Sequence, residues 1–127
     1  NGETDDLLAI LAWLKESCPE RAIWLAGFSF GAYVAARAAK VWPAKQLICV
    51  APPIENFPFK ELPPFPCPWI LVQGDEDEVV SPTAVFSWVN SLEHPPEVIK
   101  IHGATHFFHG HLIELRDCLA TLLNKTH

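Results

Sequence analysis

The sequence predicts an α/β fold in which a parallel sheet of about four strands is flanked by helices. Short apolar stretches, typical of strands buried on both faces, alternate with helical segments along the 127 residues. Prolines and capping residues separate these segments and mark where the helices begin or end. The expected strands are 22–26, 46–50, 69–73 and 97–102, and the expected helices are 4–19, 31–42, 81–92 and 111–123.

Each expected helix carries a start signal, a stop signal or a recognisable packing face. Thr4 is a capping residue followed by acids, and leucine and isoleucine then recur at helical spacing. The helix from residue 31 is rich in alanine, which permits close packing on a sheet, and Pro43 ends it. Ser81 and Pro82 form an N-cap with proline in the first turn. The last helix is amphipathic, as expected of a helix that covers a sheet.

The segment 51–68 interrupts this alternation with seven prolines and three phenylalanines. We interpret it as a stiff surface loop within a single domain of residues 1–127, placed so that its phenylalanines wall an apolar pocket. Its stretch Pro63-Pro64-Phe65-Pro66 also fits the P-x-x-P pattern of ligands for SH3-like domains, which is an alternative role.

Composition excludes several classes of partner. The formal net charge of −6 argues against nucleic acids and anionic membranes, and no apolar run reaches the roughly 18–20 residues of a membrane span. The cysteines show no C-x-x-C spacing, so we expect reduced thiols in a cytoplasmic protein rather than a disulfide framework. They are Cys18, Cys49, Cys67 and Cys118.

One serine, Ser29, lies between Gly27 and Gly31 where an apolar strand gives way to a helix. A sharp strand-to-helix turn strains such a serine into the open and leaves room only for very small residues two positions before and after it. The pattern G-x-S-x-G in this context is typical of a nucleophile elbow. The plainer alternative is a glycine turn that carries a surface serine.

A nucleophilic serine needs a base and an acid, and both follow later strands in the required order. The acidic segment 74–80 follows the third expected strand and holds Asp75 and Asp77 as candidates. The segment 103–110 follows the fourth and holds His106. Because the carboxyl ends of parallel strands share one edge of a sheet, we expect these groups to converge near the serine.

Further histidines near His106 compete for its role or suggest a metal site. They lie in a strand and a turn rather than at i, i+4 on a helix, so we expect surface or rim positions and no metal site. They are His102, His109 and His111.

Three stretches together resemble the α/β-hydrolase superfamily, specifically small bacterial hydrolases similar to dienelactone hydrolases. They are LAGFSFGAYVAARAA, WILVQGDEDEVVSP and GATHFFHG. The resemblance implies the C-terminal part of that fold, with Asp77, the second aspartate of G-D-x-D, as the acid and His106 as the base. His106 would take the proton of Ser29, and Asp77 would hold the imidazole in the right tautomer. No cofactor is implied.

The resemblance also implies an oxyanion hole with two donors, of which these residues supply one. The Phe30 N–H follows the nucleophile and is one oxyanion donor, whereas the other comes from a loop after an earlier strand. With no methionine in the chain, we expect strands and this loop before Asn1. Without them, the strand 22–26 has an open edge, and the alternative expectation is that the chain forms a homo-oligomer through it.

These features favour a serine hydrolase, an esterase-like enzyme that cleaves a small carboxylic ester or related acyl bond. Phe28, Phe30 and the phenylalanines of 51–68 indicate an apolar acyl or alcohol group in the substrate. The alternative is a catalytically silent α/β-hydrolase fragment or binding module, which keeps the fold without the reaction.

Overall fold

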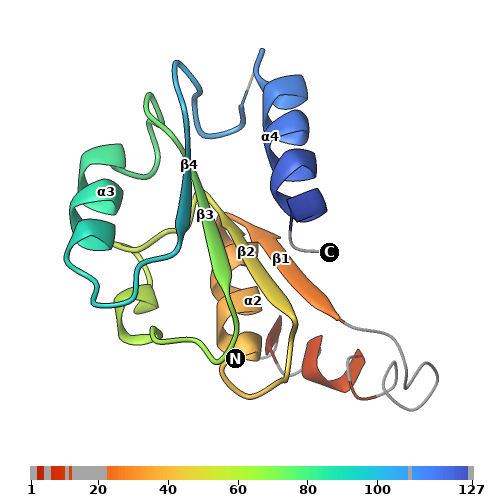
Figure 1. The fold of residues 1–127 in the computed structure, drawn as a ribbon. Helices are drawn as coiled ribbons and strands as arrows, with labels where there is room; N and C mark the ends of the chain where they lie inside the picture. Colours follow the sequence, from red (N-terminus) through yellow and green to blue (C-terminus); the bar gives the residue numbers. More distant parts are fainter. Residues whose placement is uncertain (1–2, 5–6, 11, 13–22, 109, 126–127) are drawn as a thin grey trace.

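Four parallel strands form one sheet in the computed structural model, which describes residues 3–4, 7–10, 12, 23–108 and 110–125 (Figure 1). The strands follow the chain order β1-β2-β3-β4 across the sheet. They are β1 (Trp24–Phe28), β2 (Gln46–Val50), β3 (Trp69–Gly74) and β4 (Glu97–Ile101). The helices are α2 (Phe30–Ala39), α3 (Pro82–Asn90) and α4 (Leu112–Lys125), with a short 3-10 helix η1 (Phe59–Glu61).

The predicted fold class is confirmed, and the strand boundaries differ from prediction by no more than two residues. The largest shift is in β1, which continues through Gly27 and Phe28 because these residues pair in register with Cys49 and Val50 of β2. Glycine is depleted in strands, so its presence suggested an earlier end. The predicted helix at Thr4 is present, but Glu3 is already helical, so the prediction that Thr4 caps this helix is wrong. The predicted end of the helix lies outside the described residues.

The apolar core lies on both faces of the sheet, with α2 and α3 on one face and α4 on the other (Figure 1). The interior strand β3 is buried along its whole length, as expected of a parallel strand covered on both sides. The alanines of α2 are almost fully buried, so the helix packs closely on the sheet as their pattern predicts. They are Ala32, Ala35, Ala36, Ala38 and Ala39.

Half of the residues in the segment 51–68 are exposed, and others pack into the core, so the predicted surface loop is partly buried. Phe59 is fully buried and contacts the rings of Trp69 and Trp88. Phe59 packs inward because burial of its large apolar ring is favourable. Lys40 Nζ donates to the Pro64 carbonyl at 2.7 Å, which holds the stretch 63–66 near α2. Recognition by an SH3-like domain stays a prediction.

The described cysteines are free thiols, as the sequence predicts. Cys49, Cys67 and Cys118 carry free thiols, and Cys18 lies outside the described residues. Burial raises the pKa of the Cys49 and Cys67 thiols, so neither forms a reactive thiolate at neutral pH. Within the described ranges, no helix combines the length and apolarity needed to cross a membrane.

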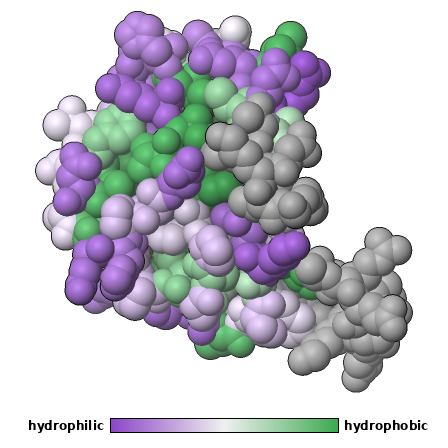
Figure 2. All heavy atoms as spheres, in the orientation of Figure 1, coloured by the Kyte–Doolittle hydropathy of each residue, from purple (hydrophilic) through white to green (hydrophobic). Residues whose placement is uncertain are grey.

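Some large apolar side chains stay at the surface. Figure 2 shows apolar residues in a band across one face of the molecule, with hydrophilic residues around it. Isolated exposed apolar residues are ordinary in proteins. Phe28 and Phe107 are not isolated, because their ring centroids lie 5.7 Å apart. Within the described part of the sheet β1 is an outer strand, and self-association through it remains a prediction.

Candidate active site

Ser29 occupies a strained turn between β1 and α2. Its φ of 54° and ψ of −120° lie in a region that residues other than glycine rarely adopt, at a cost of order 1–3 kcal/mol. The Ser29 N–H donates to the Val50 carbonyl at 2.8 Å, which fastens the turn to β2. Although Ser29 precedes the first helical residue, its hydroxyl makes no capping hydrogen bond to α2. The hydroxyl is therefore available to a partner outside the helix.

The two glycines around Ser29 have different roles. A Cβ at Gly27 would lie only 2.1 Å from the Gly31 carbonyl oxygen, so the contact between strand and helix requires glycine there. A Cβ at Gly31 would meet nothing within 4 Å among the described residues beyond its neighbours and its own helix backbone. The expectation that both positions need very small residues is therefore wrong for Gly31, because its carbonyl makes the contact rather than its Cα.

A chain of hydrogen bonds joins the three predicted site residues. His106 Nε2 lies 3.1 Å from Ser29 Oγ, and His106 Nδ1 lies 2.7 Å from Asp77 Oδ2. The side chains of His106 and Asp77 are only 3% and 1% exposed. Ser29 follows β1, Asp77 follows β3 and His106 follows β4, so the parallel sheet gathers all three at its carboxyl edge.

The Asp77 carboxylate is fully satisfied by donors of its own chain. Oδ1 accepts from the backbone N–H groups of Val79 and Val80, at 2.8 and 2.7 Å. Oδ2 accepts from Gln73 Nε2 at 3.1 Å as well as from the imidazole of His106. These hydrogen bonds replace those that the carboxylate would make to water, and they fix the orientation of Oδ2 toward the imidazole.

Gln73 is a site residue that the sequence reasoning missed. It is fully buried at the end of β3, where Nε2 also donates to the Gly74 carbonyl at 3.0 Å. Its Oε1 has no hydrogen-bond partner among the described residues. The available signal was a single amide in an otherwise apolar buried strand, because such a side chain needs a partner.

Asp75, the rival acid, holds a different part of the site together. Its Oδ1 accepts from the Gly103 N–H at 2.7 Å, and its Oδ2 lies 2.8 Å from Nδ1 of the exposed His102. The Gly103 hydrogen bond, followed by that of His102, lowers the pKa of Asp75. Asp75 therefore ties the acidic loop to the start of the histidine loop, and it is Asp77 that meets the imidazole of His106.

Glu78 makes a second tie between the two loops and was also missed from the sequence. Its Oε1 accepts from the His106 backbone N–H at 2.9 Å, and this bond is the main reason that the pKa of Glu78 is lowered. The acids of the D-E-D-E stretch thus divide their tasks. Asp75 and Glu78 hold the backbone of the histidine loop, and Asp77 holds the ring.

The remaining histidines lie apart from this chain of hydrogen bonds. His102 pairs with Asp75 at the surface, and His111 Nδ1 lies 3.1 Å from Glu114 Oε1. His109 is outside the described residues. Across the part of the chain that the structure describes, no group of three or more His, Cys, Asp or Glu side chains could hold a metal ion.

The predicted oxyanion donor lies at the beginning of α2. Phe30 is the first helical residue, so its N–H belongs to the first turn, whose donors have no acceptor within the helix. The aligned peptide dipoles add partial positive charge at that end. This position is compatible with the predicted oxyanion role of the Phe30 N–H, which stays a prediction together with the second donor.

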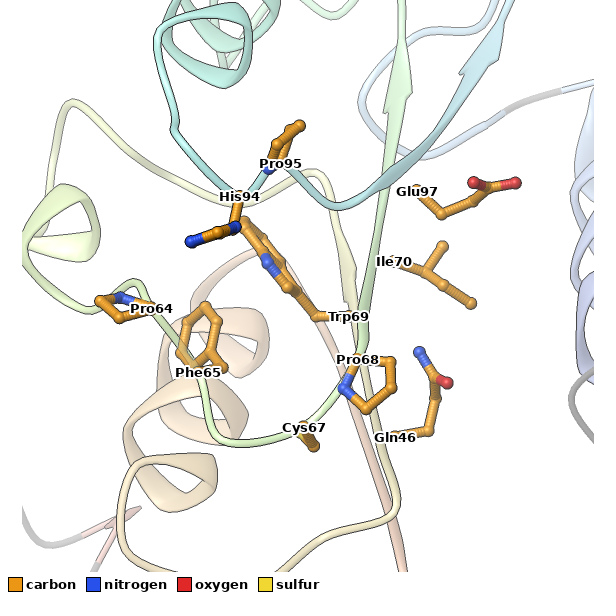
Figure 3. A pocket seen from close by; sticks show the side chains of 10 residues that line it. All are labelled: Gln46, Pro64, Phe65, Cys67, Pro68, Trp69, Ile70, His94, Pro95 and Glu97. Carbon is orange, nitrogen blue, oxygen red and sulfur yellow. The ribbon is translucent and has the colours of Figure 1, made fainter.

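A cavity of about 460 Å³ lies at the opposite edge of the sheet (Figure 3). Its walls include Gln46, Trp69 and Glu97, which are the first residues of β2, β3 and β4. Phe65 of the segment 51–68 also lines it. In a parallel sheet this amino edge is remote from groups that follow the strands. The cavity is therefore separate from Ser29, Asp77 and His106.

Known proteins of the same architecture carry serine hydrolase names. No protein-family model matches the sequence. An uncharacterized protein of Rickettsia prowazekii (strain Madrid E) is 34% identical over 140 residues, covering 99% of this chain and 59% of that protein. An alpha-beta serine hydrolase homologue from Coxiella burnetii is 48% identical with a TM-score of 0.91, covering 96% of this chain and 59% of that one. A lidless α/β serine hydrolase from Xanthomonas campestris is 42% identical with a TM-score of 0.92, covering 98% and 57%.

The four-stranded parallel sheet and the strand–serine–helix turn define an α/β-hydrolase type of fold. The chain is similar to α/β serine hydrolase homologues over nearly its whole length, which confirms the resemblance expected from its three motifs. It spans about three-fifths of the length of these relatives. It therefore corresponds to part of the complete fold.

Proposed function

We propose that this chain carries the nucleophile, base and acid of a serine hydrolase that cleaves a small carboxylic ester or a related acyl bond. The observation that supports this most directly is the continuous hydrogen-bonded chain from Ser29 Oγ through His106 to Asp77. The strained backbone of Ser29 adds support, since strain of this kind persists where a structure enforces a special orientation.

The proposed reaction begins with attack of Ser29 Oγ on the carbonyl carbon of the ester. His106 Nε2, 3.1 Å away, takes the hydroxyl proton as the new C–O bond forms. Asp77 Oδ2 accepts the Nδ1–H of the imidazole, which selects the tautomer with a free Nε2 and stabilises the imidazolium. The carbonyl oxygen becomes an oxyanion and is stabilised by the Phe30 N–H.

Collapse of this tetrahedral species breaks the bond between the carbonyl carbon and the alcohol oxygen. The leaving alkoxide takes the proton from His106 Nε2 and departs as the alcohol. Water then attacks the acyl carbon while His106 Nε2 takes a proton from it. Collapse of this second tetrahedral species breaks the bond between the acyl carbon and Ser29 Oγ, which regains its proton from His106 as the carboxylic acid leaves. Ser29 and His106 thus return to their starting protonation states, and no step requires a cofactor.

The test is covalent labelling of the full gene product with a fluorophosphonate probe, read by intact mass. We expect one adduct per chain, lost in Ser29→Ala and retained in Ser87→Ala, which alters an exposed serine of α3. Circular dichroism melting checks that both variants are folded. Absence of an adduct on the folded wild-type protein would contradict the proposal and favour the catalytically silent alternative.

A further inference from the structure

Aromatic side chains flank Ser29 in two separate groups. Those of the first group contact the imidazole of His106, and we call them the histidine-side aromatics: Phe28 and Phe107. Those of the second group pack on one another around the first turns of α2, and we call them the helix-side aromatics: Phe30, Tyr33 and Phe57.

The two groups lie on opposite faces of the sheet. Successive strand residues point to opposite faces, and Gly27 faces α2 because its missing side chain would collide with Gly31. Phe28, the next residue of β1, therefore points to the face that α4 covers. His106 and Phe107 lie in the loop between β4 and α4 and meet Phe28 there.

The histidine-side aromatics are unusually exposed for phenylalanines. Phe28 is 40% exposed and Phe107 is 57% exposed, although their rings contact each other and both contact His106. The ring centroids of Phe28 and Phe107 lie 5.1 and 5.0 Å from that of His106. Together they form an apolar platform open to solvent beside the group that moves the proton.

The helix-side aromatics are less exposed as a group, although Phe57 is 37% exposed. Tyr33 is buried, and its ring stacks on that of Phe57 with centroids 5.3 Å apart. Phe30 contacts both rings, so the group joins the segment 51–68 to α2. The helix-side rings pack mainly on one another, whereas a larger part of the Phe28 and Phe107 surface is exposed to solvent.

The chemistry of the proposed reaction decides which part of an ester reaches the open platform. The leaving alcohol receives its proton from His106 Nε2, so its oxygen must come within hydrogen-bond reach of that nitrogen. Side chains that pack on the imidazole then contact the group attached to this oxygen. On this basis, which rests on the proposed function, we propose that Phe28 and Phe107 bind the alcohol portion of the substrate and favour esters of aromatic alcohols.

The test compares two acetates on the full gene product, methyl acetate and benzyl acetate. Both form the same acetyl-Ser29 intermediate, and their alcohols are of similar acidity, so a difference in kcat/KM reports contacts of the alcohol portion during acylation. We expect wild-type protein to prefer benzyl acetate. Phe107→Ala should lower the ratio of kcat/KM for benzyl acetate to that for methyl acetate by about 3- to 10-fold, the range of one aromatic contact.

Two further variants sharpen this test. Phe107→Tyr keeps the flat ring and should retain the preference for benzyl acetate. Phe86→Ala is the matched control, since Phe86 is a half-buried phenylalanine of α3 whose ring lies against the Lys100 ammonium. It should leave the ratio of the two kcat/KM values unchanged.

The outcomes separate this inference from the proposed function. Equal losses for both acetates in Phe107→Ala would overturn it, because they would assign Phe107 to holding His106 rather than to binding the alcohol. Equal kcat/KM for both acetates in the wild type would also overturn it, while fluorophosphonate labelling of Ser29 would leave the serine hydrolase proposal intact. If neither acetate reacts and no label is found, both proposals fail.

Discussion

The two edges of the sheet differ in what they hold. At the carboxyl edge, Ser29, His106 and Asp77 form one hydrogen-bonded chain, and the last two are buried. At the amino edge, a cavity of about 460 Å³ is lined by Gln46, Glu97 and several aromatic and proline side chains, and none of the three linked residues reaches it. Because all strands of a parallel sheet end at the same edge, side chains that follow them converge there. The size of a cavity is therefore a poor guide to chemistry in this molecule.

The largest expected effect tests this difference with one carboxylate at each edge. Asp77→Asn leaves an amide that cannot hold the imidazole in the required tautomer, so kcat for ester hydrolysis should fall by about 10⁴. Glu97→Gln makes the same chemical change in the cavity wall and should alter kcat by less than about 2-fold. Steady-state hydrolysis of a small ester measures both. Comparable losses would break the distinction between the edges.

The next effect concerns the elbow itself and compares its two glycines. Gly27→Ala would place a methyl group in collision with the Gly31 carbonyl oxygen. Relief of this collision requires the backbone of α2 to shift, which costs more than the movement of a flexible side chain. We expect a loss of about 3 kcal/mol or more in the free energy of unfolding. Gly31→Ala has room and lies in the first turn of α2, so it should change stability by no more than about 1 kcal/mol.

Urea unfolding followed by tryptophan fluorescence measures both glycine variants. Equal destabilisation would show that the close contact depends on both Cα positions rather than on the carbonyl of Gly31.

A smaller effect compares one buried glutamine at each edge. Gln73→Leu removes one donor from Asp77 Oδ2, and kcat/KM should fall by about 10-fold, within the range of hydrogen bonds to charged groups. It also removes an oxygen that lacks a partner among the described residues, which offsets part of the cost of the lost donor, so the free energy of unfolding should change by no more than about 1 kcal/mol. Gln46→Leu, the same change in the cavity wall, should leave kcat/KM within about 2-fold.

Parallel loss of stability and activity in Gln73→Leu would indicate a purely structural role. Opposite or independent changes would assign Gln73 to the positioning of Asp77.

The smallest effect is a pH dependence of stability that comes from the ties between the two loops. Hydrogen bonds lower the pKa of Asp75 and of Glu78 in the folded state. Their stabilisation is present above the unfolded pKa values, about 3.9 and 4.3, and is lost as pH falls through the lower folded values. Thermal melts at pH 7 and pH 3 should show a smaller fall in Tm for Asp75→Asn/Glu78→Gln than for the wild type. An equal fall would mean that these carboxylates do not contribute.

Some residues of the candidate active site could be predicted from local sequence patterns. The G-x-S-x-G stretch predicted Ser29 because a strand-to-helix turn is a local feature of five consecutive residues. The fold class and the order of serine, acid and histidine followed from the alternation of apolar strands and helices. His106 was expected because it follows the last strand. These inferences depend only on residues that are close in the sequence and on the rule that parallel strands end at the same edge of a sheet.

The sequence by itself thus determined the α/β class, the elbow at Ser29 and the strands after which an acid and a base lie. The residue pattern alone left Asp75 and Asp77 as rival acids, and the family resemblance favoured Asp77. The tertiary structure shows the physical reason, since the two aspartates are two residues apart on one loop and face different partners 28 and 29 residues away. It also decided the tasks of Gln73, Glu78 and Phe107. Their contacts depend on how the loops after β3 and β4 pack against each other. No pattern of neighbouring residues encodes which way a side chain points from one loop to the other.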